Sequence, residues 1–296
     1  MSEMLVDVVA PYRLDLTVAV LRRFSTNLVD TERDGTYRRA LTGFASPVVV
    51  SVRQSGPAQL AVGIAGAAGE DARALALVRR MLGSERRTPV FDRGAANIPW
   101  LRGLAKRVRG VKPPRYPTLW EACVNAIVFQ QVSIYAAGAI LSRTIQALGS
   151  PIESDGVALH AFPAIEALAD ASDETLQTAG LSRGKIATLR RVAEALLTGA
   201  LDEAMLEERD TPGAIELLCT IKGIGPWTAA VILLRGLGRL DLFPANDSGV
   251  ARSLALLGGD PDDVQPTFEA LGAERGMLYY HLLLARLEAR GEIRTG

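Results

Sequence analysis

The feature that most constrains this chain is a short glycine-rich connection between two helical stretches. Thr211 with Pro212 begins one helix and Pro226 begins the next, because proline is favoured in the first turn of a helix. The intervening residues Ile221–Gly225, Ile-Lys-Gly-Ile-Gly, leave room only for a tight turn. Its two glycines allow positive φ and leave backbone N–H groups uncovered. The sequence therefore predicts a helix–hairpin–helix unit over 212–236.

Bare amides at such a hairpin suit a phosphate of DNA. The second helix adds its own unpaired N–H groups and the positive end of its dipole. A contact of this kind carries no base-sequence preference. An ordinary turn between helices is the alternative, but the pattern extends from Leu218 to Ala229, which favours phosphate binding. The predicted DNA contacts of the unit are Lys222, Gly223, Ile224, Gly225 and Thr228.

The first ninety or so residues predict an antiparallel sheet with two helices on one face. Valines alternate along one segment, and Ser55-Gly56-Pro57 is typical of a turn between strands. The predicted elements are a helix over Leu16–Phe24, strands over Tyr37–Phe44, Pro47–Arg53 and Gln59–Ala65, and a helix over Glu70–Leu82. We assign 1–92 to this α+β domain.

A passage rich in proline and glycine, Pro89–Pro117, is predicted to be irregular, and the rest of the chain to be helical. Thr118 and Ser133 are suited to cap the first two helices, and Gly149 to end the second. Later helices are expected at roughly 163–171, 173–179, 183–199, 212–219, 226–236, 248–257 and 277–290. We assign 93–296 to an all-helical second domain.

Composition excludes several classes of protein. With two cysteines and two histidines in 296 residues, neither a disulfide framework nor a metal centre is expected. No secretory signal opens the sequence, and no apolar run approaches the roughly 18 residues of a membrane span, so we expect a soluble cytoplasmic protein that contacts no membrane.

Net charge is zero, so any nucleic-acid surface has to be local. Basic residues gather in 93–115 and 183–191, and acids gather in 201–210 and 259–263. This segregation is consistent with one DNA-facing side, although solvated surface is the commoner explanation of charge runs. The basic residues concerned include Arg102, Lys106, Arg107, Arg109, Lys112, Arg115, Arg183, Lys185, Arg190 and Arg191.

The hairpin sequence IKGIGPWTAA, followed by FPANDSGVARSL, resembles the helix–hairpin–helix DNA glycosylase superfamily, and in particular the bacterial 3-methyladenine DNA glycosylase II (AlkA) family. The segments PTLWEACVNAIVFQQVSIYAAGAI, AGLSRGKIATLRRVAEAL and PYRLDLTVAVLRRF extend the likeness over essentially the whole chain. The resemblance implies an α+β N-terminal domain followed by a mainly α-helical, two-lobed glycosylase domain.

The resemblance assigns Asp247 as the catalytic carboxylate. Breaking an N-glycosidic bond builds positive charge on the sugar, which a carboxylate stabilises while it orients the attacking water. Asp247 is also suited to cap the helix that follows it, and the two roles are compatible. Trp227 stands where relatives that also nick the backbone carry a lysine nucleophile. The resemblance therefore implies an enzyme that releases a base and stops.

Access to a base requires flipping it out of the duplex and filling the gap with a wedge. The resemblance places Gln131 at the wedge tip with Gln130 and Ser133 beside it, although a solvated loop is an alternative, and the polar Gln131 departs from the family's aliphatic wedge. The expected base pocket consists of Trp227, Val231 and Ser248. Tyr279 and Tyr280 can supply further aromatic surface, at least one of them being core.

The implied activity is monofunctional excision of alkylated purines, of the 3-methyladenine type, from double-stranded DNA. We expect a monomer that requires no cofactor, with a monovalent cation at the hairpin left open. A non-catalytic protein that binds damaged DNA and a glycosylase for another class of lesion are the alternatives.

Overall fold

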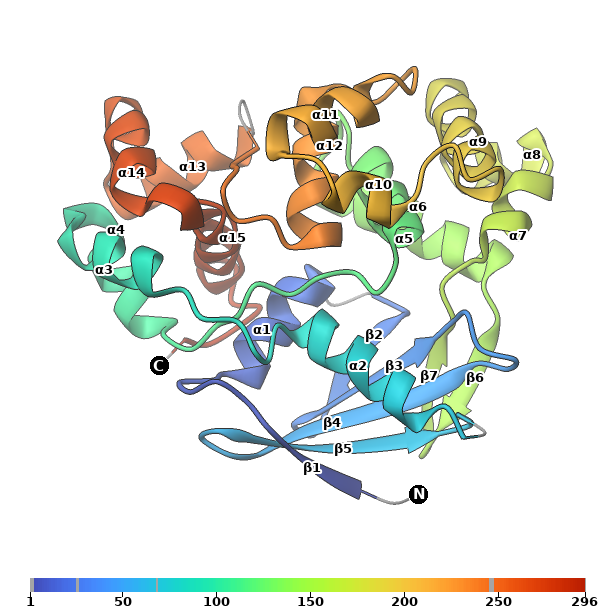
Figure 1. Ribbon diagram of the computed structural model, residues 1–296, viewed down its shortest axis with the longest axis horizontal. Coiled ribbons are helices and arrows are strands. Elements are labelled where there is room, and N and C mark those ends of the chain that lie inside the picture. The colour runs from blue at the N-terminus through green and yellow to red at the C-terminus, as the bar shows by residue number, and fades with distance from the viewer. Residues whose placement is uncertain (1–2, 25–26, 68, 245–247, 296) are drawn as a thin grey trace.

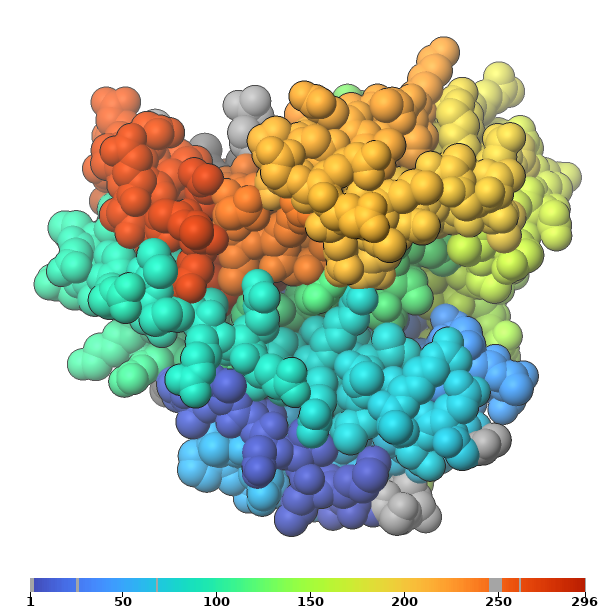
Figure 2. Space-filling model, in the orientation of Figure 1, coloured from blue at the N-terminus to red at the C-terminus, as the bar shows by residue number. Residues whose placement is uncertain are grey.

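The computed structural model describes residues 3–24, 27–67, 69–244 and 248–295 (Figure 1). An antiparallel sheet lies at one end of the molecule, and helices form the other end. The helical part has two lobes, one holding α13 (Ser248–Leu257) and α14 (Val264–Leu271) and the other α9 (Arg183–Leu197) to α12 (Pro226–Ile232), with α15 (Met277–Ala289) and α5 (Leu119–Val128) between them and the sheet. The space-filling view shows the two lobes as the red and the orange-to-yellow parts of the upper half, above the blue N-terminal part (Figure 2). The predicted fold class is confirmed.

The N-terminal sheet has the strand order β1-β5-β4-β3-β2, and every neighbouring pair is antiparallel. Its strands are β1 (Glu3–Asp7), β2 (Asp30–Arg33), β3 (Thr36–Leu41), β4 (Val48–Gly56) and β5 (Gln59–Ala65). Helices α1 (Leu14–Arg22) and α2 (Asp71–Leu82) lie over one face, as predicted. The two outer strands β1 and β2 were not predicted. β2 is short and polar, and therefore lacks the alternating pattern that marks a half-buried strand.

The passage predicted to be irregular contains two helices, α3 (Pro89–Asn97) and α4 (Pro99–Arg107). Both begin with a proline at the first helical positions, where the missing N–H costs nothing. The prolines therefore start helices in this passage, and the prediction of irregular chain was wrong.

A two-stranded hairpin, β6 (Pro151–Ser154) and β7 (Val157–His160), interrupts the part expected to be all-helical. Its turn, Asp155-Gly156, has positive φ at both residues, and Asp-Gly is the strongest short-range hairpin signal. Leu159 packs with Ala40 and Val49 on the sheet face opposite the helices. The second part of the chain is therefore mainly, and not entirely, helical. Because one hydrophobic core runs from the sheet into the helices, the boundary at 92/93 stays a prediction.

The remaining helices follow the predicted caps. Thr118 and Ser133 each accept a hydrogen bond from the backbone three residues on, which confirms both as N-caps. The elements are α5 (Leu119–Val128), α6 (Ile134–Leu148), α7 (Ile165–Asp170), α8 (Asp173–Thr178), α9 (Arg183–Leu197), α10 (Glu203–Glu207), α11 (Thr211–Cys219), α12 (Pro226–Ile232), the π-helical turn η1 (Leu233–Leu237), α13 (Ser248–Leu257), the 3-10 turns η2 (Pro261–Asp263) and η3 (Gly272–Glu274), α14 (Val264–Leu271) and α15 (Met277–Ala289). No helix in these described ranges has the length and apolar character needed to cross a bilayer.

A buried charge cluster joins the sheet to the helical part. Arg39 on β3 is only 1 % exposed and bonds to Asp30 on β2 at 2.6 Å and to Glu121 on α5. The hydroxyl of Tyr37 donates to Asp30 at 2.7 Å. Burial raises the pKa of Glu121 even though Arg39 opposes this shift, which shows how strongly the site is desolvated. The cluster anchors the first turn of α5 on the sheet.

Removing the buried cation tests this anchor. We expect Arg39→Met to lower the free energy of unfolding by about 3–5 kcal/mol, because it leaves two carboxylates buried without their partner. Urea denaturation measures the change. The control is Arg53→Met, which removes a half-exposed partner of Glu3 and should cost no more than about 1 kcal/mol. Equal losses of unfolding free energy in the two variants would show that the buried cluster stabilises the protein no more than a surface ion pair does.

Candidate active site and nucleic-acid interface

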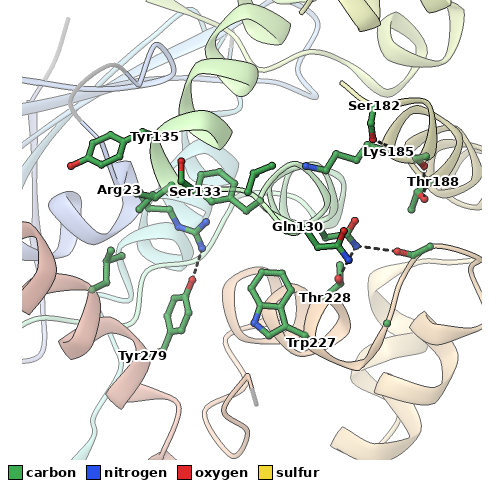
Figure 3. A pocket seen from close by; sticks show the side chains of 18 of the residues that line it. Arg23, Gln130, Ser133, Tyr135, Ser182, Lys185, Thr188, Trp227, Thr228 and Tyr279 are labelled. Atoms are coloured by element: carbon green, nitrogen blue, oxygen red, sulfur yellow. Dashed lines mark hydrogen bonds between the residues drawn. The ribbon is translucent and has the colours of Figure 1, made fainter. Parts of the chain in front are cut away.

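A groove of about 1330 Å³ lies where the hairpin, the α5–α6 turn, α9, α13 and α15 meet. Side chains from all of these elements, together with Arg23 at the end of α1, line it (Figure 3). The charged side chains among these described lining residues are all basic: Arg23, Lys185, Arg191, Lys222, Arg252, Arg286 and Arg290. The groove therefore suits a polyanion.

The helix–hairpin–helix unit has the predicted form, with α11 and α12 joined by a tight turn. Gly223 has φ +105, and a Cβ there would lie 2.9 Å from Thr188 Cβ on α9 and closer still to its hydroxyl oxygen. Gly225 differs, because its φ is −102 and a Cβ there would meet nothing within 4 Å. Only Gly223 is required by the backbone and by packing. At Gly225 the absence of a side chain instead leaves the start of α12 open.

The hairpin amides divide into paired and open groups. The Ile224 N–H donates to the Ile221 carbonyl at 2.9 Å, and the Ile224 side chain is buried. Within the described ranges the N–H groups of Gly223 and Gly225 have no hydrogen-bond acceptor in the protein. These two amides, beside the exposed Lys222, are the donors that a phosphate can reach.

Protein donors already occupy the hairpin carbonyls. The Lys222 carbonyl accepts from Arg191 Nη1 at 3.1 Å and the Gly223 carbonyl accepts from Gln130 Nε2 at 3.0 Å. The positively charged guanidinium of Arg191 therefore already contacts one of these carbonyls, and we propose no cation there. The described residues also contain no cluster of three or more His, Cys, Asp or Glu side chains able to hold a metal ion.

Gln130 couples the α5–α6 turn to the hairpin. Its amide nitrogen donates both to the Gly223 carbonyl and to Thr228 Oγ1, the latter at 2.8 Å (Figure 3). Thr228 is buried and Gln130 is half-buried, and both line the groove; their contacts with DNA stay predictions. The pair holds the turn and the hairpin in one fixed relation.

Gln131 lies at the tip of the α5–α6 turn, as predicted, with φ +55 and an exposed side chain. Val132 beside it is also exposed, so an aliphatic group accompanies the polar tip. The Ser133 hydroxyl accepts from the Ala136 N–H and caps α6. Its contact with DNA stays a prediction.

Of the expected base pocket, only Trp227 is found in the groove. Val231 is 2 % exposed and belongs to the hydrophobic core, away from the groove lining, so its assignment to the pocket was wrong. The side chain of Ser248 and the whole of Asp247 lie outside the described residues. Tyr279 on α15 lines the groove, whereas Tyr280 is core and donates to the Leu234 carbonyl at 3.2 Å.

Arg23 is one of the groove residues that sequence reasoning missed. It ends α1 with φ +63 and is 4 % exposed, and its Nη2 donates to the Tyr279 hydroxyl at 2.8 Å. Its guanidinium carbon lies 4.7 Å from the centroid of the Phe129 ring. A left-handed conformation costs a non-glycine residue roughly 1–3 kcal/mol, which these contacts offset. Residues 23, 129 and 279 come together only in the tertiary structure.

The two basic runs of the sequence, 93–115 and 183–191, lie in different places relative to the groove. From the second run, Lys185 and Arg191 line the groove; Lys185 Nζ donates to the Val128 carbonyl at 2.7 Å, and partial burial lowers its pKa. No residue of the run over 93–115 lines it. Arg115 binds the Gly236 carbonyl and Arg107 binds Glu288, so that run supports the fold away from the groove.

An α+β domain, two helical lobes, an open-amide hairpin and a basic groove with aromatic walls define a helix–hairpin–helix protein of the nucleic-acid-binding class. The chain belongs to the HhH-GPD superfamily of base excision DNA repair proteins, whose family model matches residues 124–273.

Relatives agree with this assignment. The chain is 32 % identical over 191 residues to a probable bifunctional transcriptional activator/DNA repair enzyme AlkA of Mycobacterium tuberculosis, covering 62 % of this chain and 36 % of that protein. It is 28 % identical to a DNA-3-methyladenine glycosylase of Bacillus subtilis, covering 57 % of this chain and 56 % of that one. The matches thus span between about a third and somewhat more than half of these relatives.

Among solved structures, the 3-methyladenine DNA glycosylase from Archaeoglobus fulgidus has the same overall fold. Its TM-score is 0.81 at 25 % identity, covering 96 % of this chain and 99 % of that one. The likeness therefore includes the N-terminal sheet domain, which lies outside the family-model match.

The two hairpin glycines make a matched pair of tests. We expect Gly223→Ala to lower the free energy of unfolding by about 3 kcal/mol, because its Cβ collides with Thr188 and its φ is left-handed. Gly225→Ala should stay within about 0.5 kcal/mol of the parent while weakening duplex binding, since its methyl group covers the open amide surface. Urea denaturation and duplex titration at fixed salt measure both. A stable Gly225→Ala protein with unchanged affinity would argue against the hairpin as the phosphate site.

Proposed function

We propose that this chain is a monofunctional DNA glycosylase that hydrolyses the N-glycosidic bond of damaged purine nucleotides in double-stranded DNA. Alkylated purines of the 3-methyladenine type are the first substrates to test, because the named relatives act on that base. The observation that carries the proposal is the open-amide hairpin beside a basic groove walled by Trp227 and Tyr279, in a member of a base-excision repair superfamily.

In this mechanism the backbone holds the DNA and side chains hold the base. The amides of Gly223 and Gly225 take a phosphate, and Gln131 enters the space that the flipped nucleotide leaves. Because Gln130 bonds the α5–α6 turn to the hairpin, the wedge and the phosphate grip keep a constant spacing. The extruded base stacks on Trp227, whose indole face also attracts a positively charged purine.

Asp247 supplies the chemistry in this proposal. It directly precedes α13 in the sequence and lies outside the described residues. Its carboxylate stabilises the positive charge that grows on the sugar and orients a water for attack. The proposed enzyme needs no cofactor, acts as a monomer and works in the cytoplasm.

The absence of lyase activity follows in this proposal from Trp227, because an indole cannot form a Schiff base with the sugar. We expect borohydride to trap no protein–DNA adduct on a damaged duplex that the parent protein processes. A Trp227→Lys variant, which places an amine at that position, should give a trapped adduct. Gel electrophoresis of the borohydride-treated mixtures makes the comparison. An adduct with the parent protein would assign nucleophilic chemistry to another groove lysine, such as Lys185 or Lys222.

Replacing the carboxylate separates catalysis from binding. We expect Asp247→Asn to lower base release from methylated duplex DNA by at least about 10²-fold, because the transition-state charge loses its partner. Duplex affinity should be unchanged or higher, since a negative charge near DNA is removed. Chromatography of released bases and duplex titration provide the two measurements.

Asp241→Asn is the matched control. Asp241 accepts a hydrogen bond at 2.6 Å from the hydroxyl of Thr211, the first residue of α11. Loss of the Asp241 carboxylate should leave base release near the parent value. A parent protein that binds damaged duplexes and releases no base would instead support a non-catalytic damaged-DNA-binding protein. Release of another class of base alone would support a different lesion specificity.

A further inference from the structure

The N-terminal domain contributes a cation to the wall of the groove. Arg23 extends from the end of α1 into the space that Trp227 and Tyr279 face (Figure 3). Two aromatic rings hold its guanidinium, with Phe129 at 4.7 Å and Tyr279 at 6.0 Å from ring centroid to guanidinium carbon. The position of the charge is therefore set by packing between domains, and it lies at the place proposed for the flipped base.

The hydrogen bond between Arg23 and Tyr279 has only one possible direction. A guanidinium has donors and no acceptor, so the Tyr279 oxygen accepts at 2.8 Å. The hydroxyl proton of Tyr279 must then point elsewhere, and this residue lines the groove. A hydroxyl that accepts from a cation is also polarised into a stronger donor. Tyr279 therefore offers a donor to whatever base enters.

A base that meets this donor gains most if it carries a lone pair and no positive charge. A carbonyl oxygen or an unsubstituted ring nitrogen provides such an acceptor. Methylation of a purine ring nitrogen removes the lone pair there and makes the nucleoside cationic, which the permanent charge of Arg23 disfavours. Stacking on Trp227 has the opposite preference, because an indole face attracts cations. Arg23 and Tyr279 together thus counteract the preference for cationic bases that Trp227 alone would give.

We propose that Arg23 is a positioning residue that sets lesion specificity through Tyr279, favouring neutral damaged purines with a hydrogen-bond acceptor over cationic N-methylated purines. This inference rests on the proposed glycosylase function. A site built around a fixed donor discriminates against ligands without a matching acceptor, because the donor is then left buried and unpaired.

The test compares two lesions in one duplex sequence under single-turnover conditions. Hypoxanthine is neutral and has a carbonyl oxygen, whereas the 3-methyladenine nucleoside has no carbonyl oxygen, and its positive charge makes the remaining ring nitrogens N1 and N7 weaker acceptors. We expect Tyr279→Phe, which removes only the hydroxyl, to lower the hypoxanthine to 3-methyladenine rate ratio by about tenfold. Arg23→Met should lower this ratio further, because it also removes the repulsion of the cationic base, and Arg23→Lys should restore part of it.

Tyr280→Phe is the matched control, since Tyr280 lies next to Tyr279 on α15 and its hydroxyl bonds only to backbone carbonyls of the core. Its effect on the two rates should be equal, so the ratio stays within twofold of the parent. The change in the rate ratio in the double variant Arg23→Met/Tyr279→Phe should be smaller than the two single changes combined, because one hydrogen bond couples the two residues.

Two results would overturn the inference. A ratio that stays within twofold in Tyr279→Phe and Arg23→Met, while the parent releases either base, would refute the role of this pair and leave the proposed function intact. A parent protein that releases neither base would refute the proposed function and the inference with it.

Discussion

The site depends on the placement of α5, and α5 is held by the buried ion pair between Arg39 and Glu121. Charges without solvent persist only when they are paired, so this contact leaves the helix little freedom on the sheet. The other end of α5 leads into the turn that carries Gln130 and Gln131. Because Gln130 bonds to the hairpin, α5 links the position of the N-terminal sheet to the position of the hairpin.

Backbone and side chains have separate functions around the groove. The hairpin offers amides because Gly223 packs too closely on Thr188 for any side chain and Gly225 leaves the start of α12 bare. The wall proposed to face the base is built from distant side chains, with Trp227 from α12, Tyr279 from α15 and Arg23 from the end of α1. The N-terminal domain therefore lines part of the groove as well as supporting the helices.

The two basic runs show what a charge pattern in the sequence can and cannot predict. The run over 93–115 and the cluster over 183–191 are equally basic in sequence, yet only the cluster supplies groove residues. Arginines of the first run bind a helix-end carbonyl and a surface carboxylate instead. A basic stretch of sequence shows only that positively charged side chains are present. Whether they contact solvent, backbone or a ligand depends on how the surrounding helices and strands pack.

The sequence by itself determined the local features: the helix caps at Thr118 and Ser133, the hairpin between two prolines, and the presence of Trp227 where a lysine would change the chemistry. These follow from the conformational and chemical properties of a few adjacent residues. The Asp155-Gly156 turn was equally visible and was overlooked. Only the tertiary structure decided that Val231 is core, that Gln130 bonds to the hairpin and that Arg23 meets Tyr279. Those outcomes depend on which helix faces touch, and contacts between residues hundreds of positions apart leave no local pattern in a single sequence.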